Sequence, residues 1–249
     1  MPQSTRLLYF ISGALCLALP LAALFLWRAK TRSAAAPFFA GAVVFAVFSI
    51  ILPPLFDKAL LPLVFPGGDG NANGGLIIIY LALQEGIFRQ TGSLFAIKAL
   101  TTKYRSPETA LTYGLGHGGA ECIWAFGRGL IMGALTGVYF AGRPSVFPPK
   151  DVLSFLDPLT ASAFDILSIP AMCAFALLLQ ASLAVLLFKA VTAPGKMWLF
   201  PVAILIHSVY AAIDLNILEI AVALLTAFFA VKTYKTLTHP ASPPQQESQ

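Results

Sequence analysis

The chain has 249 residues, of which 58% are hydrophobic and only 11% are charged, and its mean hydropathy is +0.80. This composition excludes an ordinary soluble domain. The formal net charge of +5 does not indicate nucleic-acid binding, because the basic residues lie singly or in small groups at the ends of apolar segments. That distribution is typical of membrane topology signals. The sequence therefore predicts an integral membrane protein surrounded by lipid, with no nucleic-acid partner.

The first apolar segment, residues 7–27, is followed directly by the basic residue Arg28. It is too long for the apolar core of a signal peptide, and its flanking charge lies on the far side. We therefore predict a retained helix with its N-terminus outside the membrane. A second span is expected from Ala34 to Leu52, where a pair of prolines should end it.

Further along the chain, apolar runs alternate with polar or proline-rich connections. The glycine- and asparagine-rich stretch 67–75 predicts an exposed flexible loop, and the Pro/Gln/Ser-rich tail 240–249 predicts disorder. Residues 197–231 are barely long enough for two crossings, so one tilted helix is an alternative there. The predicted fold class is all-α, a polytopic transmembrane helix bundle of about seven spans in a single domain, residues 1–239. The later spans are expected at 76–100, from 107 onward, at 159–191 and within 197–231.

The basic residues also predict the orientation of the bundle. With the N-terminus outside, ten Lys and Arg residues fall in the inner loops or the C-terminal flank, and four fall on the outer side. Because positively charged loops stay in the cytoplasm, this bias places the C-terminus there.

The three cysteines, Cys16, Cys122 and Cys173, all lie inside apolar stretches. No pair of them has the CxxC spacing of a redox or metal site. We interpret them as small core residues and expect no disulfide framework.

Two polar patches interrupt the apolar spans, and we interpret them as two halves of one intramembrane site. An ionisable side chain at the centre of a transmembrane helix costs roughly 3 kcal/mol or more, so such residues need a partner or a function. Glu85 and Arg89 are i,i+4 neighbours in the third span. Tyr113, His117 and Glu121 follow the same spacing in the fourth. At helical pitch each patch presents its polar groups on one face.

The patches have a structural and a functional interpretation. In the structural one, Glu85 with Arg89, and His117 with Glu121, are buried pairs that hold packed helices together. In the functional one, a histidine and a carboxylate activate water, and a second histidine, His207, donates to the oxyanion of a tetrahedral intermediate. The glycines around His117 would then leave room for a substrate backbone.

Three motifs together resemble the YhfC family of bacterial membrane proteins. They are the ExxxR of residues 85–89, the Gly-His-Gly-Gly-Ala-Glu of residues 116–121, and a later span with His207 and Asp214. That family is regarded as a distant relative of the glutamic-type intramembrane proteases, which include the CAAX prenyl proteases and their bacterial CPBP relatives. The resemblance covers residues 74–231. In the wider superfamily a glutamate pair precedes the arginine, whereas this chain has a single glutamate there.

The resemblance implies an intramembrane endopeptidase, a hydrolase without a cofactor that cleaves a membrane-embedded peptide or protein in the bacterial cytoplasmic membrane. Glu85, or Glu121 if the first motif has degenerated, would be the general base that deprotonates water. His117 would help to orient that water. These roles require the two polar patches to form one site.

The remaining site residues are given supporting roles by the same resemblance. Arg89 would orient or neutralise Glu85, and His207 would stabilise the oxyanion. Asp214 lies seven residues after His207, on the same face if the helix continues, and would fix the histidine tautomer. The oligomeric state stays open.

Two other functions are compatible with the same residues. The first is a zinc-dependent intramembrane metalloprotease, in which His117, Glu121 and His207 hold the metal and water takes the fourth position, although the chain has no HExxH motif. The second is a transporter, channel or membrane scaffold, in which the acidic and histidine groups relay protons or bind an ion. The sequence contains no recognisable inverted repeat, which favours the protease.

Overall fold

The computed structural model describes residues 3–65, 70–128, 130–131, 162–213 and 216–238. All regular secondary structure in these ranges is helical, and two short elements, η1 and η2, are π-helical. The elements are α1 (Gln3–Thr31), α2 (Ala36–Phe45), η1 (Ala46–Ile51), α3 (Leu52–Val64), α4 (Gly70–Leu100), α5 (Pro107–Glu121), η2 (Cys122–Gly127), α8 (Ala163–Thr192), α9 (Leu199–Ala212) and α10 (Asn216–Thr238).

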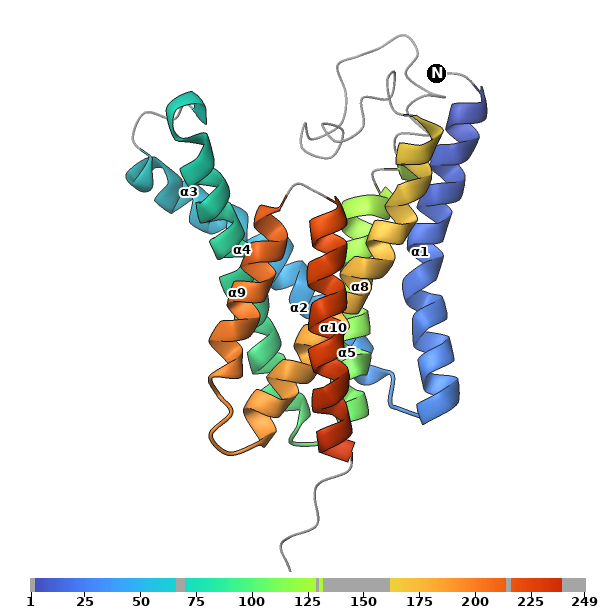
Figure 1. Cartoon of the computed structure of the whole chain (residues 1–249), viewed down its shortest axis with the longest axis vertical. Coiled ribbons are helices and arrows are strands. Elements are labelled where there is room, and N and C mark those ends of the chain that lie inside the picture. Colours follow the sequence, from blue (N-terminus) through green and yellow to red (C-terminus); the bar gives the residue numbers. More distant parts are fainter. Residues whose placement is uncertain (1–2, 66–69, 129, 132–161, 214–215, 239–249) are drawn as a thin grey trace, which may run out of the picture.

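The helices run up and down in one bundle, which confirms the predicted all-α fold of about seven spans (Figure 1). Among the described residues, four helical runs are long and apolar enough to cross a membrane by length and composition. The stretch 197–231 forms two antiparallel helices, α9 and α10, and not one tilted helix. With 14 residues, α9 is about 21 Å long and therefore shorter than the ~30 Å hydrocarbon core.

The second predicted boundary was wrong. The prolines after Leu52 do not end the second span, because they directly follow the π-helical segment η1 and become the first residues of α3. Helical structure therefore continues from Ala36 to Val64 through the π-helical segment η1. The predicted loop 67–75 is also helical from Gly70 onward, because α4 begins there.

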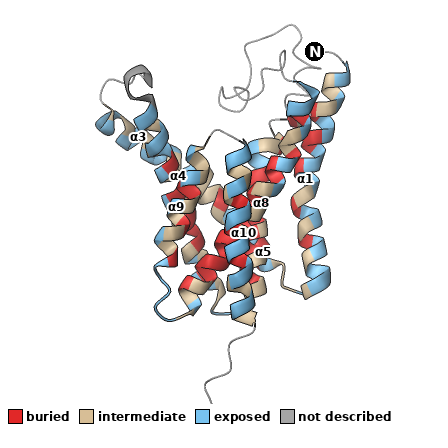
Figure 2. Cartoon of the chain, in the orientation of Figure 1, coloured by how far each residue is buried: buried red, intermediate tan, exposed pale blue. Residues whose placement is uncertain are grey.

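Helix α8 lies at the centre of the bundle (Figure 2). In its most apolar window 72% of the residues are buried, against 17% in the corresponding window of α10. The outer helices therefore present apolar side chains to lipid, whereas α8 is covered by protein on most sides. Helix α8 begins with a capping box, in which Ser162 and Asp165 bond each other's backbone N–H groups.

The predicted basic bias has a structural counterpart. Helices α1, α4, α8 and α10 run in the same direction, and each carries a Lys or Arg in its last turn. These charges therefore gather at one end of the bundle, opposite the N-terminal end of α1. The assignment of that end to the cytoplasm, and the extent of the single domain, stay predictions. The predicted loop before residue 159 and the tail from 240 lie outside the described residues.

Candidate active site

Arg89 is the centre of the candidate site, because it joins the two polar patches. Its Nη2 lies 2.5 Å from Oε1 of Glu85 on the same helix, and its Nη1 lies 2.5 Å from Oε1 of Glu121 on α5. The arginine is only 8% exposed. A planar guanidinium can serve two carboxylates at once, which an ammonium does less well. The structure therefore brings the predicted halves of the site together through one shared cation.

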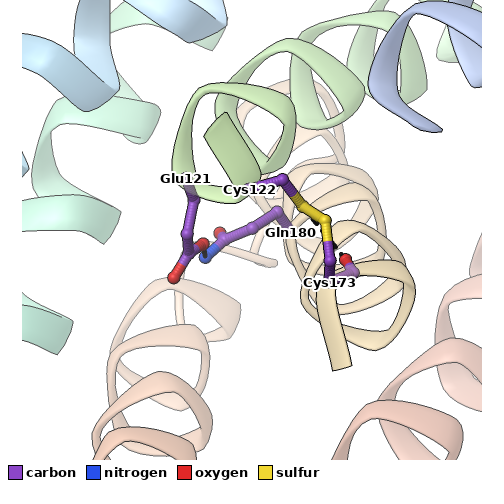
Figure 3. The surroundings of a disulfide bond; sticks show 4 residues. All are labelled: Glu121, Cys122, Cys173 and Gln180. Atoms are coloured by element: carbon purple, nitrogen blue, oxygen red, sulfur yellow. Dashed lines mark hydrogen bonds between the residues drawn. A yellow bond between two sulfur atoms is a disulfide. The ribbon is translucent and has the colours of Figure 1, made fainter. Parts of the chain in front are cut away.

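Glu121 is held from two sides. Its Oε1 accepts from Arg89, and its Oε2 accepts a hydrogen bond of 2.8 Å from Nε2 of Gln180 on the central helix α8 (Figure 3). The side chain of Glu121 is 11% exposed. Both carboxylate oxygens are therefore occupied by protein donors in a closed environment.

A disulfide lies directly beside this contact. It joins Cys122, the first residue of η2, to Cys173 on α8, and Figure 3 shows it next to the Glu121–Gln180 pair. The expectation that these cysteines are unpaired core residues was wrong. The two Cα atoms are 5.3 Å apart on facing helices, which is disulfide range, although 51 residues separate them in sequence. The third cysteine, Cys16, is a buried free thiol.

His207 faces Glu85 from α9. Its Nε2 lies 3.8 Å from Oε1 of Glu85, and its Nδ1 lies 2.9 Å from Nε2 of Gln90 on α4. Close packing of α4 and α9 makes this possible, because a Cβ added at Gly86 would lie 2.8 Å from the carbonyl oxygen of Ile204. His207 itself is only 1% exposed.

His117 is packed between aromatic rings. Phe45 meets its imidazole edge-on at 5.6 Å between centroids, and the Tyr113 ring lies at 6.1 Å. Neither ring nitrogen of His117 has a hydrogen-bond partner within the described residues, although the side chain is buried. His117 therefore does not form the predicted hydrogen-bonded pair with Glu121. Phe45 also lies under Arg89, with the guanidinium carbon 5.2 Å from its ring centroid.

The glycines of α5 do not leave room for a substrate, contrary to the prediction. A Cβ at Gly116 would overlap the carbonyl oxygen of Phe38 on α2, and one at Gly119 would lie 2.7 Å from Pro20 on α1. The glycines instead let neighbouring helices approach the α5 backbone closely. Glu85 is the most exposed of the three ion-paired side chains: it is 38% exposed, against 10% for Arg89 and 11% for Glu121.

Three residues of the site were missed by the sequence analysis. Gln90 and Gln180 carried a usable signal, since an amide inside an apolar span needs a partner as a charge does. Phe45 carried none, because it is one aromatic residue among many in its span. Asp214 lies outside the described residues, and its role stays a prediction; the described helix α9 ends at Ala212.

These features define a class of protein: a polytopic α-helical membrane protein whose ionisable groups converge on one buried, ion-paired centre. A family model described as YhfC intramembrane metalloprotease matches residues 15–234. The chain therefore belongs to the YhfC family of intramembrane proteases, as its motifs predicted. Neither the comparison with curated proteins nor the comparison with solved structures gives a match.

The family description implies a metal ion, so the fit of the site to a metal can be tested on its donor atoms. Both oxygens of Glu121 are taken by Arg89 and Gln180, and Nδ1 of His207 is taken by Gln90. The guanidinium also occupies the position between the two carboxylates, where a cation would bind. Across the described ranges, no group of three His, Cys, Asp or Glu side chains could hold a metal ion. In this arrangement the described side chains of the site do not form a three-ligand metal centre.

Proposed function

We propose that this chain hydrolyses a peptide bond within or beside the bilayer, with Glu85 as the general base that activates water. The observation that carries the proposal is the position of Glu85, which is ion-paired to Arg89, faces His207 and is the most exposed of the three ion-paired side chains. A general base must reach both water and substrate, and a positioned carboxylate can take the proton of the attacking water.

Glu85 suits the role of base better than Glu121 does. Glu121 accepts hydrogen bonds on both oxygens and is nearly closed off from solvent. Glu85 meets both Arg89 and His207 through Oε1, and its side chain is 38% exposed against 11% for Glu121. Glu121 then acts as the second anchor of Arg89, which positions Glu85.

His207 is proposed to bind the oxyanion. The 3.8 Å between its Nε2 and Oε1 of Glu85 lets one oxygen atom lie within hydrogen-bond distance of both. A water held there can give a proton to Glu85 while its oxygen attacks the substrate carbonyl. The Nε2–H of His207 can then donate to the oxygen that becomes negative, a contribution typically worth 10²–10³ in rate, or about 3–4 kcal/mol.

His117 and Asp214 have weaker support within the same proposal. His117 presents two unpartnered nitrogens in a closed environment, which favours a hydrogen bond to a water or to a substrate carbonyl. For Asp214 the sequence motif is the only support. No role for either residue is needed to explain how Glu85 and His207 could activate water.

A metal-dependent form of the same hydrolysis is the second candidate, and the family description favours it. The two candidates differ in the metal content of the purified protein. Elemental mass spectrometry of the wild type and of His207→Ala separates them. Stoichiometric zinc that is lost in the variant would overturn the metal-free proposal, whereas equal, substoichiometric metal in both proteins supports it.

The proposal also covers the location and the substrate class. We expect a bacterial cytoplasmic membrane with the N-terminus outside, and a substrate that is itself membrane-embedded. Reporter fusions at each end of the chain test this orientation. A reporter active in the cytoplasm when fused to the N-terminus would contradict it.

The function is tested in cells without knowledge of the substrate. A bacterial host expresses the wild type, Glu85→Gln or Glu108→Gln, and new protein N-termini in its membranes are labelled and identified by mass spectrometry. Glu108 is the matched control, since it lies at the far end of α5 and bonds Tyr234. We expect new N-termini inside apolar spans with the wild type and Glu108→Gln only. Their persistence with Glu85→Gln would remove Glu85 as the base.

A further inference from the structure

Gln90 is a buried side chain that contacts the imidazole ring of His207. It follows Arg89 on α4, is 1% exposed, and places its amide Nε2 2.9 Å from Nδ1 of His207. Its own Oε1 is buried and has no hydrogen-bond partner within the described residues. Because Oε1 makes no bond to a described residue, the hydrogen bond between Nε2 of Gln90 and Nδ1 of His207 is the contact that holds the Gln90 amide in place.

The neighbours of His207 decide which of its nitrogens carries the proton. A neutral imidazole has one N–H donor and one acceptor nitrogen. On the Nε2 side lies Glu85, whose carboxylate is ion-paired to Arg89 and can only accept. The proton therefore belongs on Nε2, Nδ1 is the acceptor, and the amide N–H of Gln90 donates to it.

The reversed amide would give the opposite result. With Oε1 of Gln90 toward the ring, the proton would have to be on Nδ1, and the lone pair of Nε2 would face the negative Glu85. The lone pair of Nε2 and the carboxylate of Glu85 would repel each other in that arrangement. The orientation of the Gln90 amide thus decides between two tautomers of His207. In one, Nε2 is a hydrogen-bond donor; in the other, its lone pair is free to bind a metal.

We propose that Gln90 is a positioning residue that fixes neutral His207 as the Nε2–H tautomer. In this form the Nε2–H of His207 faces Glu85 and can donate to the reacting oxygen, and Nε2 is not available to coordinate a metal. The tautomer itself follows from the contacts of His207 alone, whereas its use in oxyanion binding rests on the proposed function.

The tautomer can be measured directly by NMR. The chain has only three histidines, so ¹⁵N-histidine labelling of the full chain in lipid nanodiscs gives three imidazole spin systems, and His207→Gln assigns one of them. At mildly alkaline pH, long-range ¹H–¹⁵N correlations distinguish the protonated from the unprotonated ring nitrogen. We expect Nε2 of His207 to be the protonated nitrogen in the wild type.

Two substitutions of Gln90 test its part. Gln90→Glu replaces the donor with an acceptor, and we expect the His207 proton to move to Nδ1 or the ring to become doubly protonated. Gln90→Leu removes the donor, and we expect mixed tautomers. Gln180→Leu is the matched control, because it removes the other buried glutamine of the site and should leave the His207 signals unchanged. The thermal midpoint of each variant reports whether it is folded.

Each outcome decides the inference. An Nδ1–H tautomer in the wild type overturns it, and so does an unchanged Nε2–H tautomer in folded Gln90→Glu and Gln90→Leu. Cleavage is measured separately, and Gln90→Leu is expected to lose about a hundredfold in rate, as for the loss of one oxyanion donor. Confirmed tautomers without any cleavage by the wild type would count against the proposed function and leave the role of Gln90 intact.

Discussion

Replacing Arg89 with methionine removes the cation that Glu85 and Glu121 share, and the resulting loss of stability can be estimated from the structure. Removing one partner of a buried ion pair costs about 3–5 kcal/mol, because the other charge is left uncompensated. Arg89 is 8% exposed, whereas the side chain of Glu85 is 38% exposed and is therefore the less buried partner of the pair. We therefore expect the lower end of that range, about 3 kcal/mol.

Thermal unfolding of the purified protein, followed by fluorescence in one detergent, measures this loss. For a chain of this size, about 1 kcal/mol shifts the midpoint by roughly 2–4 °C, so Arg89→Met should melt about 6–12 °C below the wild type. Arg89→Lys keeps the charge but cannot fork to two carboxylates, and we expect an intermediate midpoint.

The double variant Arg89→Met with Glu121→Gln is the decisive control. Glu121→Gln replaces one of the two uncompensated carboxylates with an amide of similar size. Gln180 can rotate its own amide to form a hydrogen bond with this new glutamine side chain. We expect it to regain at least about 1 kcal/mol relative to Arg89→Met alone. A midpoint for Arg89→Met within about 2 °C of the wild type would refute the buried ion-pair cluster.

Three further predictions follow from other contacts. Cys122→Ala, or a dithiol reductant, should lower the thermal midpoint, because the disulfide closes a loop with a sequence separation of 51 and contributes about 4 kcal/mol in the chain-entropy model; an unchanged midpoint would contradict a formed disulfide. Gly116→Ala should destabilise the bundle by about 1–3 kcal/mol in the same assay, because its Cβ meets the α2 backbone, whereas Gly75→Ala, with open space around it, should not; equal midpoints would argue against the close α2–α5 contact. Addition of a strong metal chelator should leave new N-termini in host membranes unchanged, and their disappearance would favour the metal-dependent candidate.

Much of the fold could be predicted from hydropathy, because the length of an apolar run and the position of charges set the spans. The errors arose where local rules depend on context. Proline usually ends a helix, but here a π-helical segment precedes the proline pair and the second span continues past residue 52. The predicted loop before Leu76 became the first turns of α4 for a similar reason, since Gly and Asn are weak and not absolute helix breakers.

The candidate site was predictable in its charges and not in its contacts. Helical spacing placed Glu85 beside Arg89 within one span, but nothing in the sequence says which face of α4 meets α5. The Cys122–Cys173 pair was missed because its partners come from different helices, and only the packing of α8 brings them together. The buried glutamine amides were readable as polar groups in spans, whereas their partners required the structure.

The sharing of one guanidinium by two carboxylates affects the energetics of the proposed reaction. Two negative charges and one positive charge leave the cluster of Glu85, Arg89 and Glu121 with a net charge of −1 before any substrate binds. When Glu85 takes the proton of water, it becomes neutral, and the negative charge appears on the substrate carbonyl oxygen. The reaction thus moves an existing charge over a few ångströms and creates no new one, so the cost of forming an ion in hydrocarbon does not add to the barrier.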